Sequence, residues 1–275
     1  KCIGFAENAP GAYTLTVPTG GGKTLSSLAF ALKHASKYGK RRVIYSIPYT
    51  SIIEQTADVF RNWLGDKNII EHHMNALYDT VTDADGTDGS GNPYTGIKKL
   101  ATENWDAPII ITTNVQFFES LFSNRAAKCR KLHNIAGSVI IFDEVQMLPV
   151  EYLKPFAKAF AELINHYGCT IILCSDTQPK LDEFLEKEGI VCNEIMDRVT
   201  ELYDFFKRTR LINDGPKSPE EIAAQISEHN QAMCDELTKK SEQQIYDLLP
   251  EDEGRIYITT NLGPRHRRKV IKKIS

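Results

Sequence analysis

The stretch "VPTGGGKTLSS", Val17 to Ser27, decides the fold of this chain. An apolar run, "AYTLTV", precedes its three glycines, and a helical pattern, "KTLSSLAFALKHASKY", follows them. A strand, a glycine turn and a helix in this order form a phosphate-binding loop, because backbone N–H groups and the positive end of the helix face an anion. Lys23 would then reach the β and γ phosphates of ATP, and the Thr24 hydroxyl would hold Mg²⁺.

We therefore predict an ATP site at this loop, made by Thr19, Gly20, Gly21, Gly22, Lys23 and Thr24. The common pattern G-x-x-x-x-G-K-[ST] requires a glycine where Val17 stands, so the match is incomplete. The alternative is an ordinary glycine turn between a strand and a helix. It would explain the three glycines but not why Lys23 and Thr24 follow them.

Short β-rich runs alternate with longer helical patterns over the first 190 residues. This alternation predicts βαβ units and a parallel sheet with helices on both faces. The runs are nearly continuous Ile and Val, which is typical of strands buried on both faces. The later runs are "RRVIYSIP", "PIIITT", "SVIIFDE" and "TIILCSD".

The pattern changes after Val191, so we predict one domain over 1–190 and a second, incomplete α/β unit over 191–275. Ser218 and Pro219 precede two glutamates, which predicts a helix start in the second unit. A strand is expected over residues 255–260, "RIYITT".

The run "SVIIFDEVQ" ends in two acidic residues. Asp143 would coordinate Mg²⁺, and Glu144 would polarise the attacking water as a general base. Two exposed acids at the end of a strand would be commonplace by themselves. Together with Lys23 and Thr24 in one parallel sheet, they predict a catalytic site for nucleotide hydrolysis.

Hydroxyl and amide side chains follow two other strands, in "PYTS" (48–51) and "TTNVQ" (112–116). The segment "SDT" (175–177) ends a further strand and is expected either to link the two halves of the sheet edge or to cap a helix. Open α/β folds bind ligands at this edge of the sheet, and neutral donors there suit phosphodiester oxygens. The alternative is helix N-capping by Thr50 or Ser51 and by Asn114. Capping and DNA contact are compatible, so the pattern leaves both open.

The set and order of these segments resemble superfamily two helicases, whose nucleotide loop reads [AP]-x-T-G-x-G-K-T without the earlier glycine. "VPTGGGKT" conforms to that pattern, so Val17 is no defect. Residues 15–35, 47–60, 71–75 and 112–149 are similar to the CRISPR-associated helicase–nuclease of type I interference systems. The likeness spans most of 13–180, and a weaker one continues over 257–271.

The resemblance implies a RecA-like sheet followed by part of a second RecA-like domain. It also implies an ATP-driven translocase that moves 3′ to 5′ on single-stranded DNA, recruited to an RNA-guided surveillance complex (Cascade) after an R-loop opens. A His-Asp nuclease domain would work with it, in the same or a separate chain. The matching residues are Thr19, Gly20, Gly22, Lys23 and Thr24 in the nucleotide loop, Asp143, Glu144 and Gln146 in the acidic motif, and Thr50, Thr113 and Gln116 in the DNA-tracking motifs.

The sequence departs from the family in two ways. The coupling motif, usually S-A-T, reads Ser175-Asp176-Thr177, and the chain ends before the motif that carries the arginine finger. Such a finger can contribute about 10³–10⁵ in rate, so we expect little hydrolysis by residues 1–275 alone. Two alternatives stay open: a fragment that binds ATP or a partner without turnover, and another superfamily two translocase.

Composition excludes several other classes. The net charge of -3 gives no whole-chain signal for nucleic acid, so any DNA site must be local. No apolar run approaches the ~20 residues that span a bilayer, and a cytoplasmic location is expected. Six cysteines form no C-x-x-C pair. Adjacent His72 and His73 point different ways along a strand, which disfavours a metal site there.

Overall fold

The computed structural model describes residues 1–73, 100–177, 181–252, 254–259, 261–263, 266 and 269–271. Its centre is a seven-stranded sheet with the order β3-β4-β2-β5-β6-β1-β7. Every neighbouring pair is parallel. The strands are β1 (Ala12–Thr16), β2 (Val43–Ile47), β3 (Ile69–His72), β4 (Ile109–Thr113), β5 (Val139–Phe142), β6 (Thr170–Ser175) and β7 (Cys192–Glu194).

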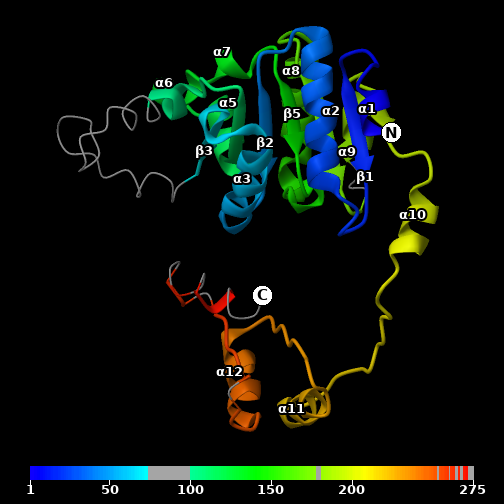
Figure 1. The fold of residues 1–275 in the computed structure, drawn as a ribbon, viewed down its shortest axis with the longest axis vertical. Coiled ribbons are helices and arrows are strands. Elements are labelled where there is room, and N and C mark those ends of the chain that lie inside the picture. The colour runs from blue at the N-terminus through cyan, green and yellow to red at the C-terminus, as the bar shows by residue number, and fades with distance from the viewer. Residues whose placement is uncertain are drawn as a thin grey trace, which may run out of the picture. The chain divides into compact units, whose positions relative to one another are not determined.

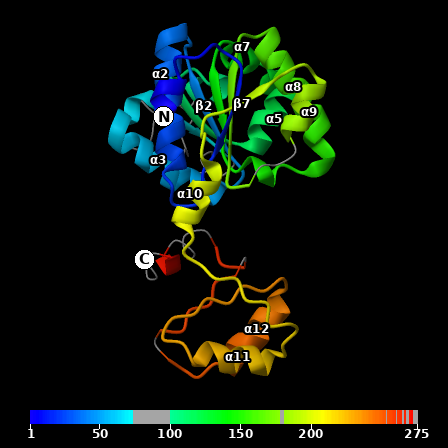
Figure 2. The same ribbon diagram turned by 90° about the vertical axis from the view of Figure 1, so that its right-hand side faces the viewer.

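Helices cover both faces of the sheet, as predicted. Figure 2 shows α2 and α3 on one side, and α5, α8 and α9 on the other. The helices of this part of the chain are α1 (Cys2–Phe5), α2 (Lys23–Tyr38), α3 (Thr50–Leu64), α5 (Asn114–Phe122), α6 (Ala126–Cys129), α7 (Leu132–Ile135), α8 (Leu153–Asn165), α9 (Leu181–Lys187) and α10 (Val199–Phe206). Short 3-10 turns lie at η1 (Asp66–Asn68), η2 (Val145–Met147) and η3 (Val150–Tyr152).

Successive strand residues point into two separate hydrophobic clusters. Ile44 and Ile140 pack with α5 and α8, whereas their neighbours Tyr45 and Ile141 pack with α2 and α3. Side chains alternate between the faces of a strand, so a strand covered on both faces buries every residue and is mostly apolar. All residues of β1, β2, β4, β5 and β6 are buried, which confirms this expectation.

The chain divides into two compact units, Lys1–Lys207 and Arg208–Ser275 (Figure 1). The first unit extends beyond the boundary predicted at residue 190. Strand β7 pairs with β1, and Leu202 of α10 packs against the core on the α2 face. The three-residue strand β7 carries too little hydrophobic pattern to be identified from the sequence.

The second unit contains α11 (Pro219–Ser227) and α12 (Lys239–Leu248). The helix start expected at Ser218 is confirmed: its Oγ accepts from Glu221 N at 3.3 Å, and Glu221 Oε2 accepts from Ser218 N at 2.8 Å. The strand expected over 255–260 is not formed across the described residues 254–259. A strand needs a neighbouring strand for its backbone hydrogen bonds, and no residue described in this unit forms one. Its identity as part of a RecA-like domain stays a prediction.

Candidate functional site

The glycine loop joins the carboxyl end of β1 to the first turn of α2, as predicted. Val17 continues β1 by donating its N–H to Ser175 O at 3.2 Å. Gly22 caps α2 with a φ of +77°, a left-handed conformation that side chains disfavour. At Gly21 an added Cβ would overlap Cγ1 of Val17 and lie 3.0 Å from the carbonyl oxygen of Pro18. The Val17 side chain therefore occupies the space that a side chain at position 21 would need, so this position favours glycine.

Lys23 is the buried cation of this edge, with a side chain only 9% exposed. Its Nζ donates hydrogen bonds to Glu144 Oε1 at 3.0 Å and to Asp176 Oδ1. Burial by itself lowers the pKa of Lys23. The hydrogen bonds to Asp176 and Glu144, with the charge of Asp143, outweigh burial and raise that pKa, so Lys23 is held as a cation.

Asp143 is hydrogen-bonded to Tyr45, a residue that the sequence analysis missed. The Tyr45 hydroxyl donates to Asp143 Oδ2 at 2.7 Å. Burial and then the charge of Asp143 raise the pKa of Tyr45 well above its ordinary value, so it keeps its proton. Burial also raises the pKa of Asp143, while the Tyr45 hydrogen bond and the charge of Lys23 act against that rise.

Glu144 sits directly after β5 in an unusual backbone conformation. Its φ of +51° is left-handed, which costs a non-glycine residue free energy and often accompanies a functional position. One carboxylate oxygen accepts from Lys23, and the other accepts from Gln146 Nε2 at 2.5 Å. Gln146 Oε1 in turn accepts from Ser175 Oγ at 2.7 Å.

These contacts close a ring of side chains at the carboxyl edge of the sheet. It runs from Lys23 to Glu144, Gln146 and Ser175, and then along the backbone to Asp176, which returns to Lys23. The ring forms because β6 lies between β1 and β5. Three segments far apart in the chain thus bring one cation and two carboxylates to a single point.

Comparison with known proteins agrees with this geometry. The family model described as DEAD/DEAH box helicase matches residues 8–184, well over half of the chain. The chain belongs to the DEAD/DEAH box helicase family. The matched region contains every strand of the sheet except β7.

Among individual relatives, the CRISPR-associated nuclease/helicase Cas3 of Haloferax volcanii is 29% identical over 201 residues, which are 69% of this chain and 22% of that protein. The chain therefore spans about a fifth of the length of this relative. The expected likeness to the CRISPR-associated helicase–nuclease is confirmed, and the chain contains a helicase-family domain related to Cas3.

Solved structures show the same fold. The DUF1998 helicase MrfA is 15% identical with a TM-score of 0.63, over 100% of this chain and 41% of that one. Cas3 of T. fusca with AMPPNP is 19% identical with a TM-score of 0.50, over 65% of this chain and 20% of that one. These likenesses confirm the RecA-like arrangement of the parallel sheet.

The three residues expected to track DNA lie at the same edge of this helicase-family sheet, after two paired strands. Thr113 ends β4 opposite Ile47 of β2, and Thr50 begins α3 three positions after Ile47. Thr113 is itself the cap of α5, because its Oγ1 accepts from Gln116 N at 3.1 Å. Asn114 is buried instead and accepts from Ser46 Oγ at 2.7 Å. The capping alternative holds at this helix, but through Thr113.

The paired histidines have structural roles. Trp105 Nε1 donates to His72 Nδ1 at 3.2 Å, and burial with the charge of Lys131 lowers the pKa of His72 to about 4. Nε2 of His73 lies 3.6 Å from Oε2 of Glu71. Within the described residues no group of three or more His, Cys, Asp or Glu side chains is arranged to hold a metal.

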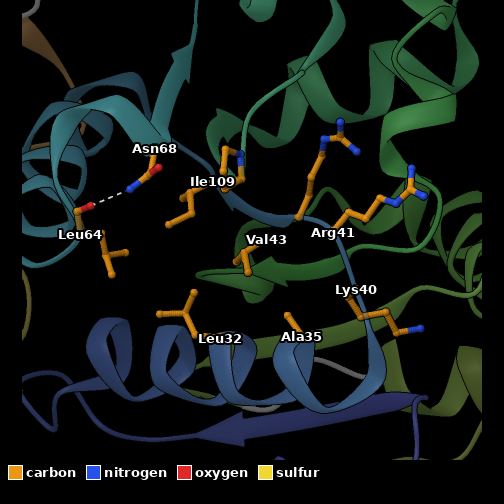
Figure 3. Close-up of a pocket in the computed structure, with 10 residues that line it drawn as sticks. Leu32, Ala35, Lys40, Arg41, Val43, Leu64, Asn68 and Ile109 are labelled. Atoms are coloured by element: carbon orange, nitrogen blue, oxygen red, sulfur yellow. Dashed lines mark hydrogen bonds between the residues drawn. The ribbon is translucent and has the colours of Figure 1, made fainter.

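A cavity of about 290 Å³ lies at the opposite, amino-terminal edge of the sheet (Figure 3). Leu32, Val43, Leu64 and Ile109 form its apolar part, and Lys40 extends away from them toward Gly168 O, to which it donates at 2.6 Å. The cavity is separate from the ring around Lys23. No described helix combines the length and apolar character that a membrane span requires.

Two residues of the site were not found by sequence reasoning. Tyr45 stands inside an apolar strand, where a buried hydroxyl needs a partner, so its polarity was the available signal. Asp176 was noted only as a departure from the coupling motif. Its contacts with Lys23 and with Thr19 Oγ1 depend on the order of the strands.

Proposed function

We propose that this chain is the ATP-binding motor segment of a DNA translocase. One observation supports the proposal above the others. Lys23 Nζ lies 3.0 Å from Glu144 Oε1 at the end of the glycine loop, so the cation of one motif and the acid of another converge on one point. A glycine turn serving only to connect strand and helix would need neither group.

In this proposal the N–H groups of Gly20, Gly21 and Gly22 and the Thr19 hydroxyl bind phosphate oxygens. Lys23 neutralises charge on the β and γ phosphates, because the ring holds it protonated. Glu144 polarises the attacking water as general base. For this role the Glu144 carboxylate would have to leave Lys23 and accept a hydrogen bond from the water, which involves movement of the Glu144 side chain.

The residues around Tyr45 fit a magnesium ion. Thr24 and Asp143 supply a hydroxyl and a carboxylate, which are hard oxygen donors, and Mg²⁺ commonly takes one or two protein ligands besides phosphates and waters. Tyr45 donates a hydrogen bond to Asp143 and so orients its carboxylate. Bound Mg²⁺ would supply neutralisation of phosphate charge, and the protein's own part is to orient these two donors.

We further propose that Thr50, Thr113 and Gln116 contact the backbone of single-stranded DNA. They lie at the carboxyl ends of β2 and β4, and β2 pairs with β5, the strand that leads to Asp143 and Glu144, so both groups of residues belong to one edge of the same sheet. Ser175 and Thr177 would couple the two sites. Ser175 is joined to Gln146, and Thr177 N donates to Ser175 Oγ at 3.0 Å.

The biological role that we propose is 3′ to 5′ translocation in type I CRISPR interference, in the cytoplasm. The target would be DNA opened by the RNA-guided complex Cascade, with cutting by a His-Asp nuclease domain. Support comes from the likeness to the nuclease/helicase Cas3 of Haloferax volcanii. In the whole protein, we expect duplexes with a 3′ single-stranded tail to be unwound and those with a 5′ tail to be left intact.

The test compares three variants of the full-length protein in ATP hydrolysis and unwinding, with and without single-stranded DNA. Lys23→Ala should abolish nucleotide binding and unwinding, whereas Glu144→Gln should keep binding and lose hydrolysis. Lys33→Ala is the matched control, because Lys33 lies on the same helix with a side chain 48% exposed and pairs with Glu7. Unwinding that survives Lys23→Ala in a folded protein would refute the site.

A further inference from the structure

Asp176 stands at the turn that follows β6, beside the phosphate loop. Its Oδ1 accepts from Lys23 Nζ, and its Oδ2 accepts from Thr19 Oγ1. The side chain is 27% exposed, so it reaches the loop from the solvent side, whereas Lys23 is nearly buried. One carboxylate therefore bridges the two side chains of the loop that we assign to phosphate binding.

A carboxylate and a phosphate oxygen are both anionic acceptors, and they seek the same donors. Lys23 has three N–H donors, and Glu144 and Asp176 each engage one of them. Asp143 also acts on Lys23 through its charge. Two carboxylates thus contact one ammonium group, and a third acts on it through its charge. A nucleotide that brings further negative charge meets repulsion from these carboxylates.

We propose that Asp176 competes with the nucleotide's phosphates for Lys23 and Thr19, and so lowers the affinity of this site for nucleoside di- and triphosphates. Because those two residues are assigned to phosphate only under the proposed function, the competition rests on that function. Asp176 is a positioning residue: it acts through Lys23 and Thr19.

Displacement of the Asp176 side chain would also affect the coupling motif, Ser175-Asp176-Thr177. Asp176 lies between Ser175 and Thr177, and Ser175 is joined through Gln146 to Glu144. A carboxylate that leaves Lys23 and Thr19 gives up the side-chain contacts between this turn and the phosphate loop. An alanine at this position, as in the S-A-T motif, has no polar atom with which to make either contact. Nucleotide binding would therefore be transmitted to this turn directly by a side chain.

The experiment measures binding of AMPPNP with Mg²⁺ to the full-length protein by calorimetry. Asp176→Asn removes the charge with little change of shape, and Asp176→Ala removes the competing acceptor. We expect both to bind AMPPNP about tenfold more tightly or better, with a gain that shrinks at high salt. Asp106→Asn is the matched control. It removes one carboxylate of an ion pair, with Arg42 at 2.6 Å, beside the amino end of β4.

Unchanged or weaker binding by both Asp176 variants, with unfolding transitions like that of the unmodified protein, would overturn the competition. An equal gain in Asp106→Asn would also overturn it, because the effect would then be one of net charge. Failure of the unmodified protein to bind AMPPNP, or equal binding by Lys23→Ala, would instead refute the proposed function. Asp176→Ala keeps the test open if the asparagine does not fold.

Discussion

The hydroxyl of Tyr45 donates to Oδ2 of the buried Asp143 carboxylate, whose Oδ1 accepts from Glu144 N, and removal of the hydroxyl should have a measurable cost in stability. Tyr45 is fully buried and donates to Asp143 Oδ2 at 2.7 Å. A hydrogen bond to a charged group contributes about 1.5–3 kcal/mol, and a buried acceptor that loses its donor carries the desolvation cost. We therefore expect Tyr45→Phe to lower the free energy of unfolding by about 2 kcal/mol at neutral pH.

The pH dependence of this cost identifies its origin. Burial raises the pKa of Asp143 and the Tyr45 hydrogen bond lowers it, so the phenylalanine variant raises that pKa further. Each unit of additional rise corresponds to about 1.4 kcal/mol lost while the carboxylate is ionised. As the pH falls through the native pKa, the carboxyl is protonated and that part of the loss disappears. The cost of Tyr45→Phe should therefore shrink in acid.

The assay is urea unfolding followed by tryptophan fluorescence, because Trp63 and Trp105 both lie in the first unit and report on it. Tyr13→Phe on β1 is the matched control, since the Tyr13 hydroxyl donates to the neutral carbonyl of Ala9. Its cost should be about 1 kcal/mol and independent of pH near the Asp143 transition. A Tyr45→Phe cost no larger than this, or one that does not change with pH, would refute the reasoning.

Two further predictions concern stability. The pKa of His72 is about 4 in the folded chain against 6.5 in an unfolded one, so the unfolded state takes up the proton first as the pH falls. The free energy of unfolding should therefore drop by about 3 kcal/mol between pH 6.5 and 4. His72→Gln keeps an acceptor for Trp105 and should remove this pH dependence. Urea titrations that show the same pH dependence in the variant would contradict the prediction. Gly21→Ala places a methyl against Val17 and should destabilise by about 1–3 kcal/mol. Val17→Ala should offset part of that cost in the double variant, and strictly additive costs would exclude the contact.

Much of the fold was predictable because its signals are local. The glycine loop follows from residues adjacent in the chain, and the continuous apolar runs identify strands covered on both faces. The helix start at Ser218 follows from a four-residue capping pattern, which the structure confirms. Elements without such signals were misjudged. The short strand β7 pairs with β1, and the first unit ends at Lys207 rather than at residue 190. Residues 254–259 do not form the expected strand.

The candidate site divides in the same way. The sequence by itself determined which residue types stand after each strand, including Lys23, Glu144 and Ser175, because each belongs to a short motif. The tertiary structure alone decided that β6 lies between β1 and β5 and that Tyr45 faces Asp143. Strand order sets which side chains meet across the sheet, and it depends on packing between segments as far apart as β1 and β7, where Ala12 pairs with Cys192. For that reason the pairing of Asp176 with Lys23 could be read only from the folded chain.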